Sequence, residues 1–141
     1  MPDGDCPFCA IATGEAEAHV VFSDSVSVAF LDIRPLFEGH TLLIPRDHHE
    51  TIWDLPDELV APYFANARRL TAAVREAMEA QGAFVAINNI VSQSVPHLHT
   101  HIVPRTRKDG LRGFFWPRGK YADGAAAEAA ARRIAAALAA G

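Results

Sequence analysis

Cysteine is scarce in this sequence: the 141 residues contain only two, Cys6 and Cys9, in the tetrapeptide CPFC. Small domains that depend on disulfides carry several cysteines, so this count excludes a disulfide scaffold. A chain of this length buries enough apolar surface without such cross-links. The composition therefore predicts one globular domain that spans residues 1–141.

Long apolar runs and an excess of basic residues are also missing. No segment approaches the length of a membrane-spanning helix, and the N-terminal MPDGDCPFCA lacks the basic and apolar regions of a signal peptide. The net charge of −4 is not that of a sequence-independent nucleic-acid binder. We therefore expect a cytoplasmic protein that binds neither membranes nor nucleic acid. A small anionic substrate remains compatible, because one pocket can be positive on an acidic protein.

The sequence also lacks a Walker-type glycine loop and the cluster of acidic residues that catalytic magnesium requires. It contains instead PHLHTHIVPR, residues 96–105, with a histidine at every second position. On a β-strand, His97, His99 and His101 share one face. Apart from a plain row of surface histidines, this pattern favours either a metal clamp or one nucleophilic imidazole with two helper groups.

Five segments have the composition of β-strands. Residues 19–24 and 25–32 are rich in β-branched and aromatic residues and are separated by a polar break, which predicts a hairpin. Residues 40–45 follow a glycine and end in a proline. Residues 83–89 and the histidine segment, 96–105, complete the set.

Two segments have helical patterns. Residues 54–82 carry apolar residues at helical spacing, with Gly82 as the expected stop. The Ala-rich segment 122–141 predicts a C-terminal helix whose narrow apolar face, Ile134 and Leu138, packs weakly. Hairpin-connected strands with helices between them indicate an α+β fold. It combines a mostly antiparallel sheet of about five strands with one long helix and the Ala-rich C-terminal helix.

The two cysteines allow three interpretations. A thioredoxin-type dithiol needs a strand before its first cysteine, and here the motif is almost at the N-terminus. A disulfide is disfavoured in a cytoplasmic chain. Half of a zinc site is the third interpretation, because zinc prefers thiolate and imidazole ligands in a tetrahedral arrangement. Spacing alone does not choose the remaining ligands. The available histidines are His19, His40, His48, His49, His97, His99 and His101.

The segment QSVPHLHTHIVPR resembles the signature of the histidine triad (HIT) superfamily, three alternating histidines followed by two apolar residues. The resemblance extends back through Asn88 and Asn89, GHTLLIPRDHHETIWDL, VVFSDSVSVAFLDIRP and CPFCAI. It covers about residues 6–105 and leaves residues 106–141 as a C-terminal extension. It implies a HIT-like fold and a homodimer. The implied interface is the helix from Leu59 to Met78 and the strand from Phe84 to Asn88.

The resemblance also implies an activity on nucleotides. His99 resembles the nucleophile that attacks the α-phosphorus and becomes transiently nucleotidylated, and His101 and Ser94 resemble its phosphate-contacting partners. Asp32 matches a carboxylate that binds ribose hydroxyls, although capping of the following turn is its structural alternative. The implied nucleotide-binding residues are Phe8, Ile11, Asp32, Ile33, Leu42, Asn88, Gln93, Ser94, His99 and His101. Asn89 is the alternative to Asn88, because the loop that follows is short.

In zinc-bearing members of the superfamily, the metal is held by the CxxC pair, the histidine of PxxH and the first histidine of the triad. The matching residues are Cys6, Cys9, His48 and His97. The resemblance therefore implies a structural zinc ion, and it divides the row of histidines between zinc at one end and phosphorus at the centre.

Some positions depart from the resemblance or stay open. Thr100 stands where the motif has an apolar residue, which a β-branched side chain on the back of the strand can tolerate. Residues 110–121 lie outside the resemblance, and we expect their aromatic residues, like Trp53 and Trp116, mainly to pack. His40 opens a strand, and a structural role is at least as plausible as a catalytic one.

Three functions of different classes compete. The favoured one is a hydrolase or transferase that cleaves the α-phosphate bond of AMP-X compounds, such as phosphoramidates, aminoacyl-adenylates or dinucleoside polyphosphates. The second is a zinc hydrolase whose HxHxH histidines bind a catalytic metal, and chelation would abolish its activity. The third is a zinc-stabilised nucleotide-binding or interaction module with little catalysis, which would bind AMP without turnover.

Overall fold

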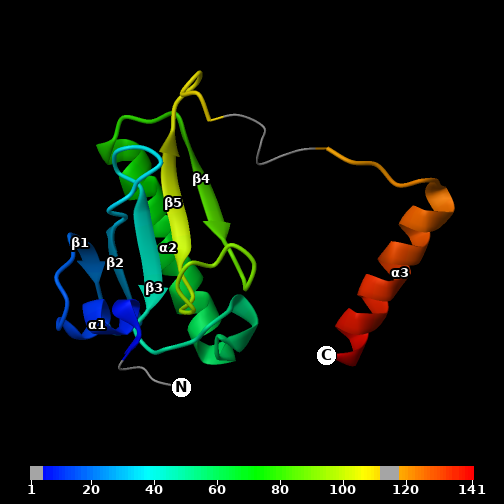
Figure 1. The fold of residues 1–141 in the computed structure, drawn as a ribbon, viewed down its shortest axis with the longest axis horizontal. Helices are drawn as coiled ribbons and strands as arrows, with labels where there is room; N and C mark the ends of the chain where they lie inside the picture. The colour runs from blue at the N-terminus through cyan, green and yellow to red at the C-terminus, as the bar shows by residue number, and fades with distance from the viewer. Residues whose placement is uncertain (1–4, 112–117) are drawn as a thin grey trace. The chain divides into compact units, whose positions relative to one another are not determined.

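The computed structural model describes residues 5–111 and 118–141, which fall into two compact units, Met1–Asp109 and Gly110–Gly141 (Figure 1). The elements are, in chain order, α1 (Pro7–Thr13), β1 (Val20–Ser23), β2 (Ser27–Leu31), β3 (Thr41–Pro45), the 3-10 turn η2 (Ile52–Asp54), α2 (Asp57–Ala77), β4 (Gly82–Ile87), β5 (Thr100–Arg105) and α3 (Gly124–Ala140). Trp116 and its aromatic neighbours lie outside the described residues. Across the described ranges, no helix combines the length and apolar character needed to cross a membrane.

One antiparallel sheet forms the centre of the first unit. Its five strands follow the order β1-β2-β3-β5-β4. The hairpin predicted over residues 19–32 is present as β1 and β2. The register places Phe30 of β2 beside Leu42 of β3, and Leu42 beside His101 of β5. The predicted α+β class with a mostly antiparallel sheet is confirmed.

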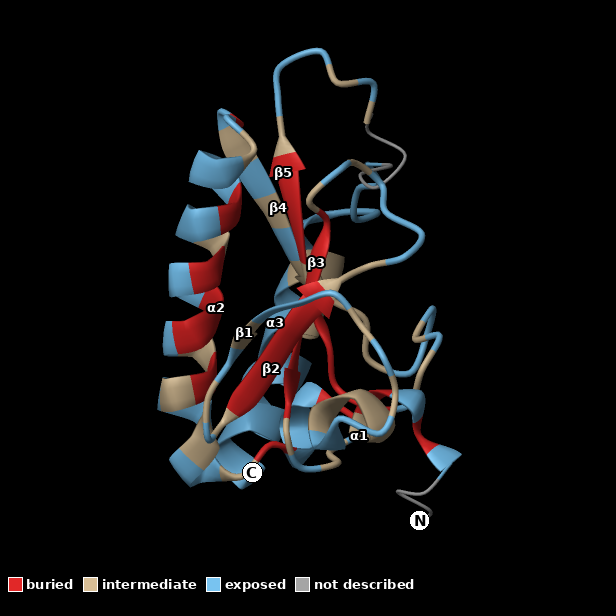
Figure 2. Cartoon of the chain, turned by 90° about the vertical axis from the view of Figure 1, so that its left-hand side faces the viewer, coloured by how far each residue is buried: buried red, intermediate tan, exposed pale blue. Residues whose placement is uncertain are grey.

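The two faces of the sheet bury two different clusters. On one face, α2 packs against β3, β4 and β5 through Tyr63, Leu70 and Val74. Figure 2 shows the buried side of α2 turned toward the sheet and its exposed side turned away, as the amphipathic pattern predicts. On the opposite face lies α1, whose Phe8 packs with Phe30 and the other members of the second cluster.

The departure from the motif at Thr100 has a structural explanation. Tyr63 is fully buried, and its hydroxyl donates to the Leu43 carbonyl at 2.8 Å. The Thr100 Oγ1 lies 2.8 Å from the same hydroxyl. A buried hydroxyl is tolerated only when it is hydrogen-bonded, so Tyr63 and Thr100 satisfy each other on the back of β5.

Three expectations about local structure are wrong. The long helix ends at Ala77 rather than at Gly82, which instead begins β4. The backbone N–H of Gln81 donates to the carbonyl of Arg105 in β5. Because this residue pairs with a strand, the helix cannot continue to Gly82. The chain turns at Glu79, whose φ is 52°. Trp53, expected to pack, is 68% exposed. The strand expected over residues 96–105 begins only at Thr100.

The histidine segment is only partly a strand, because β5 begins at Thr100. His101 therefore belongs to the strand, whereas His97 and His99 lie in the chain that leads into it. The Leu98 N–H donates to the His49 carbonyl rather than to a neighbouring strand, which explains the late start. His97 and His99 are nevertheless buried on one side, while Leu98 joins the core cluster under α2 on the other. The expected division of the segment into two faces therefore holds.

The second unit contains α3. The Asp123 side chain accepts a hydrogen bond from the Ala126 N–H at 2.8 Å and so caps the first turn. The helix predicted from the Ala-rich composition is present. Its two largest apolar side chains, Ile134 and Leu138, are 69% and 81% exposed.

Candidate functional site

Two cysteines and two histidines converge where α1 begins. The Cys9 Sγ lies 3.2 Å from Nδ1 of His48 and 3.5 Å from Nδ1 of His97, and the Cys6 Sγ lies 3.4 Å from the same His97 atom. The four candidate ligand atoms all lie within 4.8 Å of one another. Cys6 caps α1 through its sulfur, which accepts a hydrogen bond from the Cys9 N–H. Local helix geometry thus brings the two sulfurs of CPFC to one side.

The proton position on His97 suits a metal ligand. Its Nε2 lies 2.9 Å from the Pro45 carbonyl, which can only accept, so Nε2 carries the proton. Burial lowers the pKa of His97 to about 4, and the ring is therefore neutral with a lone pair on Nδ1, facing the sulfurs. A second hydrogen bond that orients a ligating imidazole is typical of metal sites. Two sulfurs and two imidazole nitrogens are a donor set that fits zinc.

His99 presents the opposite arrangement. Its Nδ1 lies 2.7 Å from the His97 carbonyl and therefore carries the proton. Burial lowers the pKa of His99, so its ring is neutral at neutral pH. Nε2 is then left with the lone pair. A neutral imidazole held in one tautomer is a good nucleophile toward phosphorus, because it brings no negative charge to the attack.

His40 and His101 form a chain of hydrogen bonds that fixes a second tautomer. The backbone N–H of Leu36 donates to Nδ1 of His40 at 3.0 Å, so the neutral His40 ring carries its proton on Nε2. That Nε2 lies 3.0 Å from Nδ1 of His101 and donates to it. The neutral His101 ring then carries its own proton on Nε2, as a hydrogen-bond donor. The sequence left open whether His40 has a structural or a catalytic role, and the structure places it in contact with His101 of the triad.

A second group of possible metal ligands, Asp32, His40 and His101, does not fit a metal. Their ligand atoms also lie within 4.8 Å of one another. A metal ligand needs a free lone pair, however, and Nε2 of His40 carries a proton because the Leu36 N–H occupies Nδ1. The three triad histidines do not form a group of ligand atoms within 4.8 Å in the described part of the chain. This geometry disfavours a catalytic metal held by HxHxH.

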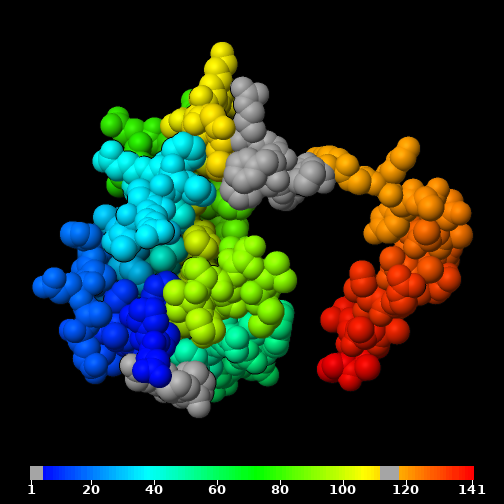
Figure 3. Space-filling view, viewed as in Figure 1, coloured from blue at the N-terminus to red at the C-terminus, as the bar shows by residue number. Residues whose placement is uncertain are grey.

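A cavity of about 330 Å³ lies on the α1 face of the sheet. Its lining residues are Pro7, Phe8, Ile11, Glu17, Ala18, Phe30, Leu31, Asp32, Ile33, Leu42, Ser94, Val95, His99 and His101. Figure 3 shows the surface hollowed between the blue N-terminal segment, the cyan segment that follows β2 and the yellow-green loop before β5. A partly apolar cleft of this size with few polar groups is typical of a small-molecule site.

The cavity gathers eight of the ten residues named from the resemblance, all except Asn88 and Gln93. The Gln93 amide is engaged elsewhere: Oε1 accepts from the Ile90 N–H at 2.8 Å and Nε2 donates to the Glu50 carbonyl at 2.6 Å. Asn89 accepts from the Ile52 N–H at 2.8 Å. Through these hydrogen bonds, Gln93 and Asn89 stabilise the short loop between β4 and β5.

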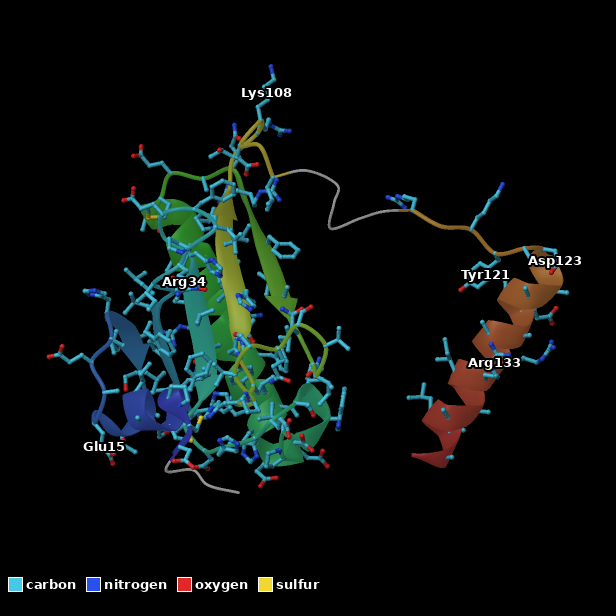
Figure 4. All side chains as sticks on the ribbon, viewed as in Figure 1. Glu15, Arg34, Lys108, Tyr121, Asp123 and Arg133 are labelled. Carbon is cyan, nitrogen blue, oxygen red and sulfur yellow. The ribbon has the colours of Figure 1, made fainter. Side chains whose placement is uncertain are left out.

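Asp32 combines its two interpretations. Its Oδ1 accepts from the Arg34 N–H at 2.8 Å, which is the turn-capping role. Its Oδ2 lies 3.6 Å from Nε2 of His40, and the residue also lines the cavity. One oxygen therefore holds the turn, and the other stays available to a ligand. The side chain of Arg34, labelled in Figure 4, is exposed.

The lining residues that the sequence did not single out are Pro7, Glu17, Ala18, Phe30, Leu31 and Val95. Phe30 had a detectable signal, because it stands two residues before Asp32 and residues at that spacing on a strand share one face. Glu17 had none, since it precedes β1 in a segment without periodicity.

The partly buried side chain of His101 predicts a particular dependence of stability on pH. Burial lowers its pKa to about 4, and the neighbouring His99 and His40 lower it further, whereas Asp32 raises it. Between about pH 6.5 and pH 4, the unfolded state therefore binds more protons than the folded state, and the free energy of unfolding falls as the pH is lowered. We expect a shallower fall in His101→Asn, whose amide oxygen still accepts from His40.

Urea unfolding of both proteins, from about pH 7 to about pH 5, measures this difference. The cluster of Cys6, Cys9, His48 and His97 is the same in both, so its titration cancels. Identical pH dependence in the two proteins would show that His101 is not the source.

Comparison with known proteins gives consistent results. The HIT domain family model matches residues 13–108. The chain is 38% identical over 114 residues to Protein hit of Bacillus subtilis (strain 168), covering 79% of each. It is 36% identical over 110 residues to adenosine 5′-monophosphoramidase HNT1 of Saccharomyces cerevisiae, covering 77% of this chain and 68% of the relative. It is 32% identical over 109 residues to adenylylsulfatase HINT3 of Arabidopsis thaliana, covering 76% and 55%.

Solved structures show the same similarity in three dimensions. SMU.412c from Streptococcus mutans UA159 superposes with a TM-score of 0.87 at 30% identity, covering 95% of this chain and 85% of the other. A Zn-bound histidine triad family protein from Mycobacterium smegmatis superposes with a TM-score of 0.73 at 36% identity, covering 96% and 99%.

Proposed function

Because this chain belongs to the histidine triad (HIT) family, whose members include nucleotide hydrolases, we propose that it cleaves the α-phosphate bond of AMP-X compounds through a nucleotidyl-histidine intermediate. The observation that carries this proposal is the state of His99. Its ring lines the cavity, and its Nδ1 proton is held by the His97 carbonyl. The Nε2 lone pair is thereby free for attack.

The proposed reaction has two steps. First, Nε2 of His99 forms a bond to the α-phosphorus while the bond from phosphorus to the leaving group X breaks, and X departs with the bonding electrons and takes up a proton from solvent. Because Nδ1 keeps its proton, the nucleotidylated ring is cationic, and its P–N bond is labile. Water then attacks the same phosphorus and releases a proton to solvent, the P–N electrons return to Nε2, and AMP leaves, which restores the neutral imidazole.

Hydrogen-bond donors around phosphorus would stabilise the charge that develops on the non-bridging oxygens. His101 supplies Nε2–H, because His40 donates to its Nδ1. Ser94 lines the same cavity. In this scheme His101 and Ser94 contact substrate, and His40 is a positioning residue that sets the tautomer of His101.

Zinc has a structural role in the proposal. Bound by Cys6, Cys9, His48 and His97, it would cross-link α1, the loop after β3 and the chain before β5. Two observations support this role: the four side chains cluster in this chain, and the similar protein from M. smegmatis is Zn-bound. The His97 carbonyl that orients His99 would then be fixed by the same residue that holds the metal.

We also propose a cytoplasmic homodimer, as the family resemblance implies. β4 is an edge strand, and its Val85 is 48% exposed, which supports an interface on that side of the sheet. Light scattering at micromolar concentration tests the assembly, and a monomer mass would count against it.

Parallel assays of adenosine phosphoramidate, diadenosine triphosphate and diadenosine tetraphosphate test the proposed activity. We expect turnover of at least one of them, with AMP as a product, and a mass increase corresponding to AMP on trapped enzyme. Binding of AMP without turnover would favour the module with little catalysis. Immediate loss of activity on chelation, with the fold intact, would favour the metal hydrolase.

Asp32 is expected to control recognition of the sugar. Asp32→Asn keeps an oxygen for the Arg34 turn but removes the charge that strengthens hydrogen bonds to the ribose hydroxyls. We expect AMP to bind about tenfold more weakly and the preference for ribose over deoxyribose to disappear. Calorimetry with AMP and dAMP measures both effects. Unchanged affinity for both nucleotides would leave Asp32 with the turn-capping role alone.

A further inference from the structure

The cavity extends across the sheet, which fixes the order of its parts. His101, Leu42 and Phe30 are successive neighbours on β5, β3 and β2, and Phe30 is paired in turn with Val20 of β1. Adjacent strands lie about 4.8 Å apart, so the path from β5 to β1 measures about 14 Å. The triad histidines stand at one end of this path. The segment that leads into β1 stands at the other.

Glu17 lies at that second end. The Ala16 N–H donates to the Ala10 carbonyl of α1 at 3.0 Å, and the His19 carbonyl accepts from the Leu31 N–H at 3.0 Å. Ala18, between them, packs on the cluster that contains Phe8 and Phe30. These contacts hold the backbone on both sides of Glu17, and its exposed side chain lines the cavity.

Glu17 and Asp32 are the two acidic residues that line the cavity, and no lysine or arginine among the described residues joins them. Asp32 is placed beside His40 and His101, where the proposed function puts the ribose. If the nucleotide is bound as proposed, with phosphorus at His99, the base extends over Leu42 and Phe30 toward β1. The carboxylate of Glu17 then meets the far edge of the base.

A carboxylate only accepts hydrogen bonds, and this selects between purines. Guanine has two adjacent donors on its Watson–Crick edge, N1–H and the N2 amino group, which match the two carboxylate oxygens. Adenine has one donor there, the N6 amino group, beside the acceptor N1, which repels a carboxylate. We propose that Glu17 is a base-specificity residue and that the cavity prefers guanine over adenine nucleotides. This inference rests on the proposed cleavage at the α-phosphate and adds that the corresponding GMP-X compounds are preferred over AMP-X compounds, which remain substrates.

Binding of GMP, IMP and AMP to the full-length protein tests the proposal. A bidentate contact distinguishes bases by about 1–3 kcal/mol, and for an exposed carboxylate we expect the lower limit, a preference of about fivefold for GMP over AMP. IMP, which keeps N1–H but lacks the 2-amino group, is expected between them. Glu17→Ala should abolish the preference, because it weakens the binding of GMP and leaves that of AMP unchanged. Glu17→Gln should reduce the preference, because an amide offers one acceptor and one donor, which pair with N6–H and N1 of adenine as well as with N1–H and O6 of guanine.

Glu15→Gln is the matched control. Glu15 is another exposed carboxylate two residues away, labelled in Figure 4, and it does not line the cavity. It should keep the preference for GMP. Equal binding of GMP and AMP by the unaltered protein, or a preference that survives in Glu17→Ala, would overturn the role of Glu17 and leave the proposed function standing. Failure of every nucleotide to bind would overturn both.

Discussion

His99→Ala is expected to reduce turnover more than about a thousandfold while the protein keeps about one zinc ion per chain and a near-native melting temperature. The alanine removes the only nitrogen that, in the proposed mechanism, bonds to phosphorus. It removes no member of the Cys6, Cys9, His48 and His97 cluster. Kinetics, metal analysis and thermal melting of the purified variant measure the three quantities.

The milder His99→Asn keeps a polar group in the buried position and separates loss of the nucleophile from collapse of the cavity. Mass spectrometry of enzyme trapped during turnover should find the nucleotidyl adduct in the unaltered protein and in neither variant. Loss of metal from His99→Ala, with Cys9→Ala fully loaded, would overturn the assignment and favour a metal held by the three triad histidines.

Cys9→Ala is expected to have the opposite effect, with loss of metal and of stability. The Cys9 Sγ contacts both histidines of the cluster, at 3.2 Å and 3.5 Å, so its removal affects more than one ligand pair. Metal binding free energy at such a site contributes directly to folding. We expect a fall in melting temperature of about 10 °C or more, since 1 kcal/mol corresponds to about 3–5 °C in a domain of this size.

His49→Ala is the control for that variant, because His49 is adjacent to His48 in sequence but is not a member of the cluster. It should retain its metal. His97→Ala should combine both effects. It removes a member of the cluster, and without that anchor the backbone carbonyl of residue 97, which orients His99, is no longer held in place. A Cys9→Ala protein with full zinc content and unchanged melting would show that the cluster holds no structural metal.

The sequence predicted the strands well because their signals are local. Alternation and β-branched residues mark β1 and β2, and Pro45 closes β3 as expected. The ends of elements were less predictable. α2 stops at Ala77 because Gln81 pairs with Arg105, a residue distant in sequence, and no local pattern announces that partner. Trp53 was expected to pack and is exposed, because aromatic character alone does not specify a neighbour.

The sequence by itself determined the inventory of chemistry: a CxxC, a row of alternating histidines and Asp32, in an order that resembles one family. Each of these motifs is made of residues close together in sequence, so its spacing can be recognised without the structure. Only the tertiary structure decided which nitrogen of each histidine carries the proton and which residues line the cavity. The His97 and Pro45 carbonyls select the tautomers of His99 and His97, the Leu36 N–H selects that of His40, and the strand register brings Glu17 to the end of the cavity remote from His101. Backbone groups carry no signature in a sequence, so hydrogen bonds to them arise only when distant segments are folded together.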